Sequence, residues 1–191
     1  MFKEYIKPAL LFFLVLTIIT GVIYPLFITG IAQVLLPKQA NGSLIYRNGK
    51  VVGSSLIGQA FDDPKYFWGR LSATSPQYNA SSSSASNIGP TNPALIDEVS
   101  GRIKALKTAD PDNTNPIPVD LVTSSASGLD PHISLAAAYY QAQRIGRIRE
   151  LSQDAIKILI AKHTSGRLFG IIGEPVVNVL ELNLALDEYK K

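Results

Sequence analysis

Hydrophobic and polar positions divide this chain of 191 residues near Lys38. No charged side chain occurs between Lys7 and Lys38, and residues 9–36 are almost wholly apolar. As a helix, this segment would extend about 42 Å, at about 1.5 Å per residue. The hydrocarbon core of a bilayer is about 30 Å thick. The pattern therefore predicts a helix that crosses a membrane once.

We expect three parts: a cytoplasmic tail at 1–8, a transmembrane anchor at 9–36, and one compact extracytoplasmic domain at 38–191. The apolar stretch of a cleaved signal peptide is usually about 7–15 residues long, so the longer stretch here favours an uncleaved anchor. The basic residues flanking the anchor are nearly balanced and do not decide its orientation. The short tail with two Lys residues favours export of the domain.

The anchor also offers a face on which another helix could pack. Thr17 and Gly21 are four residues apart, and Thr20 lies beside them. Small residues at this spacing let helices approach closely in membranes, although such residues are common in membrane helices generally. Pro25 predicts a bend because it cannot donate a helical hydrogen bond.

Beyond the anchor, the hydrophobic period changes from strand-like to helical. Asn48-Gly49 lies between two short apolar runs, which predicts a β-hairpin over 43–54. Segment 62–90 is expected to be irregular, and a short strand is expected at 119–124. Apolar spacing and N-cap residues predict four helices: from Asn92-Pro93 to Ala109, from Ser134 to Arg149, from Ser152 to Gly166, and from 178 to about 188. The fold class is α+β.

Composition excludes several classes of function. Residues 38–191 carry sixteen Lys and Arg against fourteen Asp and Glu, which is not the charge of a nucleic-acid-binding domain. The absence of Cys excludes disulfides and thiolate metal sites. His132 and His163 are far apart in sequence, so no metal site is expected. No phosphate-binding loop motif occurs.

One catalytic alternative is a membrane-anchored Ser–Lys hydrolase. It would use Ser72 or Ser75 as the nucleophile and a desolvated lysine, of which Lys50 is the only candidate, as the base.

Two further clusters have two interpretations each. Arg144 and Arg147 are one helical turn apart and could hold a phosphate or a carboxylate of a partner, or they could form a solvated face. The aromatic segment 66–70 could be a contact surface or part of the core.

Longer strings make the chain identifiable. It strongly resembles the KdpC family, the C subunits of bacterial Kdp potassium-transporting ATPases. The matching strings run through most of the chain, at 20–25, 39–44, 53–59, 66–67, 86–87, 92–93, 119–123, 125–130, 175–178 and 181–187. At Leu71 this sequence departs from the Arg-Pro-Ser that is usual in the family.

The resemblance implies a non-catalytic accessory subunit in a bacterial cell membrane. Its implied partners are a potassium-channel-like subunit, a P-type ATPase subunit and a small single-span subunit. The family is also proposed to act as a catalytic chaperone that raises the ATP affinity of the ATPase subunit. Here that proposal points to Ser125, Ser127, Gly128, Gln141 and Arg144, with ATP held jointly with the ATPase subunit. A domain outside the membrane could shift the pump's conformational equilibrium only by contacting two states differently.

Overall fold

A computed structural model describes residues 2–189. The chain divides into two compact units, Met1–Ile45 and Tyr46–Lys191, which are described separately.

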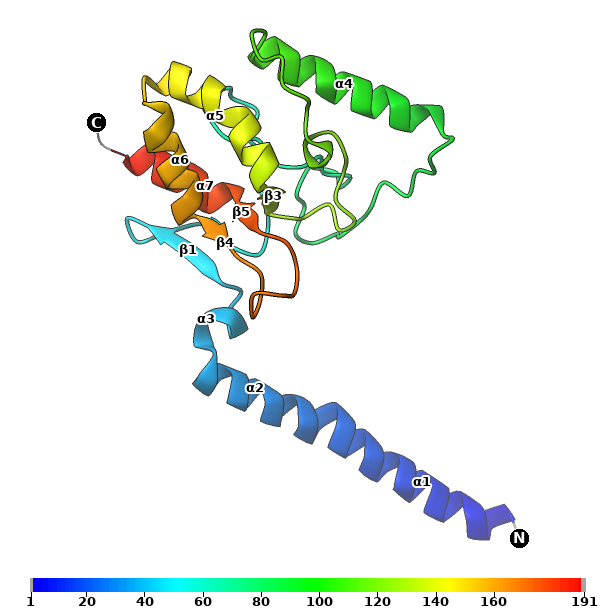
Figure 1. Cartoon of the computed structure of the whole chain (residues 1–191). Coiled ribbons are helices and arrows are strands. Elements are labelled where there is room, and N and C mark those ends of the chain that lie inside the picture. Colours follow the sequence, from blue (N-terminus) through cyan, green and yellow to red (C-terminus); the bar gives the residue numbers. More distant parts are fainter. Residues whose placement is uncertain (1, 190–191) are drawn as a thin grey trace. The chain divides into compact units, whose positions relative to one another are not determined.

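The first unit is helical (Figure 1). Helix α1 covers Phe2–Ile18, a π-helical turn covers Ile19–Ile23, α2 covers Tyr24–Leu35 and the short α3 covers Pro37–Ala40. Within this run, Glu4–Leu35 is long and apolar enough to cross a membrane, and its most apolar stretch is not buried within the chain. The π-helical turn stands where Pro25 predicted a bend, since proline leaves a helical carbonyl without its usual donor.

The predicted hairpin is confirmed. Strand β1 covers Leu44–Arg47 and β2 covers Lys50–Ser54, and the two form a two-stranded sheet. Asn48 and Gly49 have φ angles of 51° and 75°. Positive φ at both central residues is what a type I′ turn requires.

All four predicted helices form, and their N-caps are as expected. They are α4 at Pro93–Ala109, α5 at Leu135–Arg149, α6 at Gln153–Lys162 and α7 at Val179–Glu188. A side-chain oxygen of each cap residue accepts a backbone amide of its helix, and the caps are Asn92, Ser134, Ser152 and Asn178. Helix α6 ends before the predicted Gly166 because the chain enters strand β4 at Thr164.

The strand predicted at 119–124 is wrong. Val119–Leu121 is a 3₁₀ helix that follows Pro118, whose φ is −60°. The carbonyl of Val119 accepts both the Val122 amide and the Thr123 hydroxyl, the latter at 2.9 Å. These local hydrogen bonds use groups that a strand would offer to a neighbouring strand.

A small antiparallel sheet was not predicted. It has the order β3-β5-β4, with β3 at His132–Ser134, β4 at Thr164–Ser165 and β5 at Val176–Asn178. Ile133 and Thr164 both pair with Val177, one from each side. Helices α5, α6 and α7 gather beside this sheet (Figure 1).

The core lies among these elements. Its fully buried large side chains include Phe67, Leu121, Ile133, Ile145, Ile156, Ile160, Val177 and Leu182. Phe67 and Trp68 belong to it, which confirms the core interpretation of that aromatic pair over the contact-surface interpretation.

Candidate functional site

The helix residues singled out from sequence lie on an open surface of the first unit. The hydroxyls of Thr17 and Thr20 donate to the carbonyls of Phe13 and Leu16, each at 2.8 Å, so both are satisfied within the helix. A Cβ added at Gly21 would meet no atom within 4 Å. This side of the helix is therefore free for close approach by another helix.

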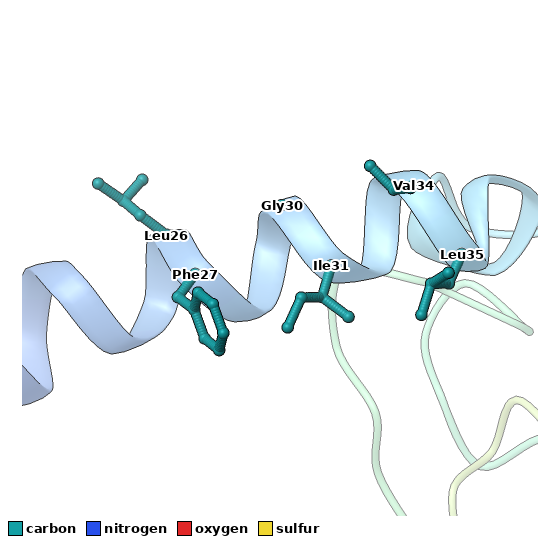
Figure 2. Close-up of a pocket in the computed structure, with 6 residues that line it drawn as sticks. All are labelled: Leu26, Phe27, Gly30, Ile31, Val34 and Leu35. Carbon is teal, nitrogen blue, oxygen red and sulfur yellow. The ribbon is translucent and has the colours of Figure 1, made fainter.

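A second feature of this unit is a groove on α2 (Figure 2). It has a volume of about 460 Å³ and is lined by Leu26, Phe27, Gly30, Ile31, Val34 and Leu35. Gly30 supplies the gap because it has no side chain, and a Cβ there would also meet nothing within 4 Å. The lining is almost entirely apolar, so the groove suits an apolar side chain or a lipid chain.

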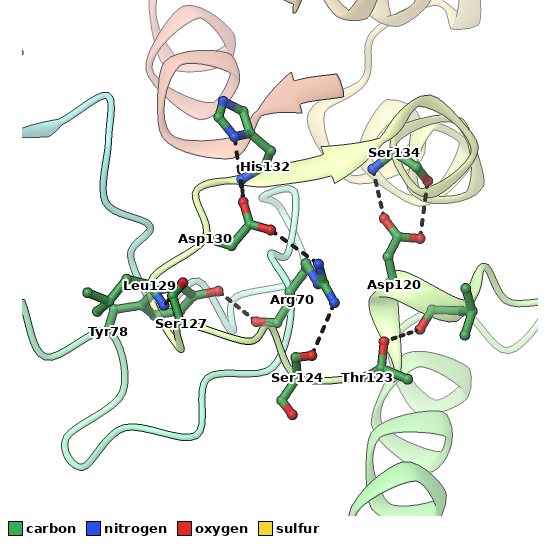
Figure 3. A network of polar contacts seen from close by, with 11 residues as sticks. Arg70, Tyr78, Asp120, Thr123, Ser124, Ser127, Leu129, Asp130, His132 and Ser134 are labelled. Carbon is green, nitrogen blue, oxygen red and sulfur yellow. Dashed lines mark hydrogen bonds and ion pairs between the residues drawn. The ribbon is translucent and has the colours of Figure 1, made fainter. Parts of the chain in front are cut away.

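In the second unit, Arg70 organises a polar network (Figure 3). Its Nη1 donates to Asp130 Oδ2 at 3.2 Å, and its Nη2 donates to the Ser124 carbonyl at 3.1 Å. Asp130 Oδ1 also accepts the His132 amide at 3.0 Å. Burial raises the pKa of Asp130, but hydrogen bonds from His132 and the Arg70 charge outweigh it and lower the pKa below 3.8. Asp130 is thus a fixed anion that ties Arg70 to the start of β3.

Nearby groups complete this network. The Tyr78 hydroxyl donates to the Arg70 carbonyl at 2.6 Å, and burial raises its pKa to about 12. Asp120 Oδ2 accepts the Ser134 amide at 2.7 Å, and Asp120 Oδ1 accepts the Ser134 hydroxyl (Figure 3). The 3₁₀ helix is thereby joined to the N-terminus of α5.

Residues Ser125, Ser127 and Gly128 belong to a loop that packs against segment 71–84. The Ser125 amide donates to the Leu71 carbonyl, and the Ser127 carbonyl accepts the Ser84 amide. Gly128 has φ +69°, and a Cβ there would lie 2.6 Å from the Ser84 carbonyl oxygen. Only glycine fits this position without a shift of the backbone.

Two buried polar atoms beside this loop have no hydrogen-bond partner among the described residues. They are the Ser125 Oγ and the Arg70 Nε. Ser125 is 3% exposed, so its hydroxyl does not face solvent.

Gln141 and Arg144 lie elsewhere, on the inner face of α5. Together with Trp68 and the backbone of Pro64 and Tyr66 they form what we call the Gln141–Arg144 cluster. Arg144 donates to the carbonyls of Pro64 and Tyr66, at 2.5 and 3.1 Å, and to Gln141 Oε1 at 2.7 Å. Gln141 accepts the Trp68 amide at 2.8 Å and donates to the Trp68 carbonyl at 3.1 Å. The cluster fixes segment 64–68 to the helix.

This cluster is closed to solvent. Gln141 is 1% exposed and Arg144 is 2% exposed. Burial lowers the pKa of Arg144 to about 10, so the guanidinium stays charged at neutral pH. The guanidinium carbons of Arg144 and Arg102 lie 4.8 and 5.0 Å from the Trp68 ring centroid, within cation–π range. Arg144 therefore does not lie on a solvated face, and that interpretation from sequence is wrong for it.

The sequence as a whole also matches a known family. The family model described as "KdpC: K+-transporting ATPase, c chain" matches residues 6–188. The chain belongs to the KdpC family.

Individual relatives in the family match over nearly their whole length. The potassium-transporting ATPase KdpC subunit of Methylococcus capsulatus is 62% identical over 185 residues, which cover 96% of this chain and 97% of that protein. The subunit of the same name from Dechloromonas aromatica is 62% identical over 190 residues, covering 99% of this chain and 100% of the relative. That of Ralstonia nicotianae is 60% identical over 186 residues, covering 97% and 91%.

Membership in the KdpC family makes the chain an accessory subunit of a potassium pump, in which catalysis belongs to another subunit. Its candidate membrane helix agrees with a place at the membrane. The five residues that the resemblance linked to nucleotide lie in two different places in this domain. Ser125, Ser127 and Gly128 lie in the loop beside 71–84, whereas Gln141 and Arg144 lie in the buried cluster on α5.

The Ser–Lys hydrolase alternative gains no support from the structure. The Ser72 hydroxyl donates to the Gly128 carbonyl at 2.6 Å and accepts the Tyr78 amide at 2.9 Å. Lys50 lies exposed in β2 and Ser75 lies exposed in its loop. Within residues 2–189, no group of three or more His, Cys, Asp or Glu side chains could hold a metal ion.

Sequence reasoning missed several residues that organise this domain. The partners of these residues lie outside their own secondary-structure elements. Tyr78 bonds to Arg70, 8 residues away, and Asp120 bonds to Ser134, 14 residues away. Asn183 accepts the amide of Phe67, 116 residues away, at 2.9 Å. No sequence pattern near these residues predicts their hydrogen-bond partners. For Gln141 and Arg144 a signal existed, because both share one helical face with the apolar residues Ala137, Ala138 and Ile145.

Proposed function

We propose that this chain is an assembly subunit that stabilises the potassium pump through its N-terminal helix and its folded domain. The partners are the potassium-channel-like subunit, the P-type ATPase subunit and the small single-span subunit. The observation that carries the proposal is the Glu4–Leu35 helix, whose most apolar stretch is not buried by any of the described residues. The open face at Gly21 and the groove at Gly30 support a role in helix packing.

The test is co-purification of the pump subunits with the tagged chain from membranes. Gly21→Leu is expected to reduce their recovery several-fold, because a larger side chain would hold a neighbouring helix away. A Cβ added at position 21 meets no atom of the described residues within 4 Å, so a loss would report on a partner. Val22→Leu is the matched control. Recovery of the unaltered chain as a lone monomer would contradict the proposal, and full recovery of Gly21→Leu would contradict its helix-packing part.

The proposal places the domain of residues 46–191 outside the cytoplasm. The short tail with Lys3 and Lys7 supports this orientation, because basic residues favour the cytoplasmic side. Cysteine labelling offers a direct test, since the chain has no native Cys. A single Cys at exposed Ser82 is expected to react in intact cells with a reagent that does not cross membranes. Reaction only after permeabilisation would place the domain in the cytoplasm.

The catalytic-chaperone role takes an indirect form in this proposal. The polar atoms of Gln141 and Arg144 already bond within the chain, which supports an effect on ATP affinity through the conformational equilibrium of the pump rather than through a nucleotide site on α5. We expect the reconstituted pump to show a higher KM for ATP without this chain. The full chain alone in nanodiscs is expected to bind no ATP at millimolar concentration. Saturable binding that Ser127→Ala weakens would instead favour direct contact by the 125–128 loop.

A further inference from the structure

The segment between β4 and β5 contains an exposed apolar turn at residues 168–172. We call it the 168–172 turn. Its four large side chains are Leu168, Phe169, Ile171 and Ile172, and all are exposed. Phe169 is 84% exposed and Ile171 is 77% exposed. Side chains of this kind normally enter the core, so a cluster of four on one turn indicates a contact surface.

Four of the five backbone amides of this turn donate hydrogen bonds within the segment. The Leu168 amide donates to the Ile172 carbonyl at 2.8 Å, and the Ile172 amide donates back to the Leu168 carbonyl at 3.0 Å. The amides of Gly170 and Ile171 also donate within the segment, to the carbonyls of Arg167 and Leu168. Amides paired in this way can enter an apolar medium without losing hydrogen bonds to water.

The residue at the tip is unusual for its conformation. Phe169 and Gly170 have φ angles of 53° and 78°, nearly the same as those of Asn48 and Gly49 in the β1–β2 hairpin. Asn tolerates this left-handed conformation well, whereas a bulky residue rarely adopts it. The chain therefore holds an aromatic side chain at the tip of a turn where local conformation favours a small polar one.

Charge is confined to the base of the turn. Residues 168–173 carry no charged side chain, and Arg167 Nη2 donates to both carboxylate oxygens of Glu174, at 2.9 and 2.8 Å. The ion pair is electrically neutral overall. Apolar side chains beyond a paired, polar base suit shallow insertion into lipid.

Two further observations favour a bilayer over a protein as the occupant. Only residues 36–45 separate the end of α2 from the second unit, and ten residues reach at most about 35 Å. This short connection keeps the second unit, which carries the turn, within a limited distance of the membrane that the helix crosses. In addition, a stable protein interface needs roughly 20–30 residues on each side, whereas the turn offers four large side chains. A weak lipid contact suffices when an anchor keeps its local concentration high.

We propose that the 168–172 turn is a second membrane contact, which inserts Phe169 and Ile171 into the lipid interface. This inference rests on the membrane helix and not on the proposed assembly role. The contact would limit the orientations that the second unit can adopt above the bilayer. It needs no anionic lipid, because Arg167 and Glu174 neutralise each other at the base.

The test uses depth-dependent fluorescence quenching on the full chain in phosphatidylcholine nanodiscs. The fluorophore NBD is attached to a single Cys, introduced as Ile171→Cys, and quenched by lipids that carry a nitroxide on the acyl chain. Ser82→Cys, on an exposed polar loop, is the matched control. We expect NBD at position 171 to be quenched at least fivefold more than at position 82, and to be shielded from iodide. Equal quenching at both positions would overturn the proposal.

Two further arms sharpen the test. Phe169→Asp in the Ile171→Cys chain is expected to lower quenching to the control level, and unchanged quenching would overturn insertion of the tip. Nanodiscs with one quarter phosphatidylglycerol are expected to give the same quenching as pure phosphatidylcholine; a requirement for the anionic lipid would overturn apolar insertion. If iodide shielding appears only after the pump subunits are added, without lipid quenching, the occupant is a protein and the proposal fails.

Discussion

The Gln141–Arg144 cluster and the 168–172 turn place side chains in opposite ways. In the cluster, a glutamine and an arginine lie deep in the domain, where they hold the backbone of segment 64–68. At the turn, a phenylalanine and three aliphatic residues lie in solvent, where none of them belongs to the core. The first region uses polar atoms to organise a segment that has no regular secondary structure. The second exposes apolar side chains that do not contribute to the core.

The difference separates residues that maintain the domain from residues that are available to a partner. A buried polar group must find partners inside the protein, and the five donor and acceptor contacts of the cluster supply them. An exposed apolar group has no such partner and gains free energy only when something else covers it. Substitutions in the cluster should therefore lower the free energy of unfolding, whereas substitutions in the turn should mainly change the contact with the membrane.

The largest effect is expected from Arg144→Met. It removes the donors that satisfy the carbonyls of Pro64 and Tyr66 and the Gln141 Oε1. We expect the free energy of unfolding to fall by about 3 kcal/mol, because buried acceptors are left unpaired. Urea unfolding of the full chain in detergent, followed by circular dichroism, measures the change.

Lys157→Met is the matched control for Arg144→Met, since it removes a cation from the exposed side of α6. Its effect should stay within about 0.5 kcal/mol. An equally small effect of Arg144→Met would show that the cluster does not stabilise the domain.

A smaller loss is expected from Gln141→Met. This change leaves the Trp68 amide and carbonyl without partners, which we expect to cost about 2 kcal/mol. The exposed neighbour Gln143 provides the control, and Gln143→Met should change little. The double variant Gln141→Met, Arg144→Met should lose less stability than the sum of the two single losses, because the two residues share a hydrogen bond. Strict additivity would contradict the idea of one cluster.

The sequence predicted those parts of the fold that depend on neighbouring residues. The starts of α4, α5, α6 and α7 follow from Asn or Ser caps, and the first hairpin follows from Asn48-Gly49. Strands β3, β4 and β5 are two or three residues long, and their pairing joins segments more than ten residues apart. Runs this short carry no periodic signal, so the second sheet could not be predicted.

The candidate site was predicted less well than the fold. The burial of Arg144 was not predicted because Gln143 and Arg147 are also polar, so the sequence of this helix does not show which polar residues face the core. The contacts of Arg70 with Ser124 and Asp130 cross more than fifty residues, and no local pattern encodes them. The apolar residues 168–172 were not singled out from the sequence, because their exposure depends on how the rest of the domain packs.

A modest pH-dependent effect is expected from Asp130→Asn. The pKa of Asp130 is lowered in the folded protein, so its charge stabilises the fold above pH 3.8, and that contribution disappears as the pH falls from 3.8 through the folded pKa. We expect the substitution to cost about 1 kcal/mol or less at pH 7, since the ion pair with Arg70 is partly exposed.

The difference between Asp130→Asn and the unaltered chain should narrow below pH 3.8 in urea unfolding experiments. Exposed Asp62 supplies the control, Asp62→Asn, which removes a surface carboxylate and should change the free energy of unfolding little at pH 7. A difference that stays constant from pH 7 to pH 3 would mean that the Asp130 charge does not contribute.

The smallest effect is expected from Phe169→Asn at the 168–172 turn. Asn tolerates the φ of 53° better than Phe does, as Asn48 does in the first hairpin, so the free energy of unfolding should rise by about 0.5 kcal/mol. Urea unfolding in detergent measures this, and Ile171→Asn, at a position without positive φ, should bring no gain. A loss above about 1 kcal/mol would show that Phe169 packs within the chain. In that case the turn would stabilise the domain, as the polar cluster does, and the contrast between the two regions would be wrong for the turn.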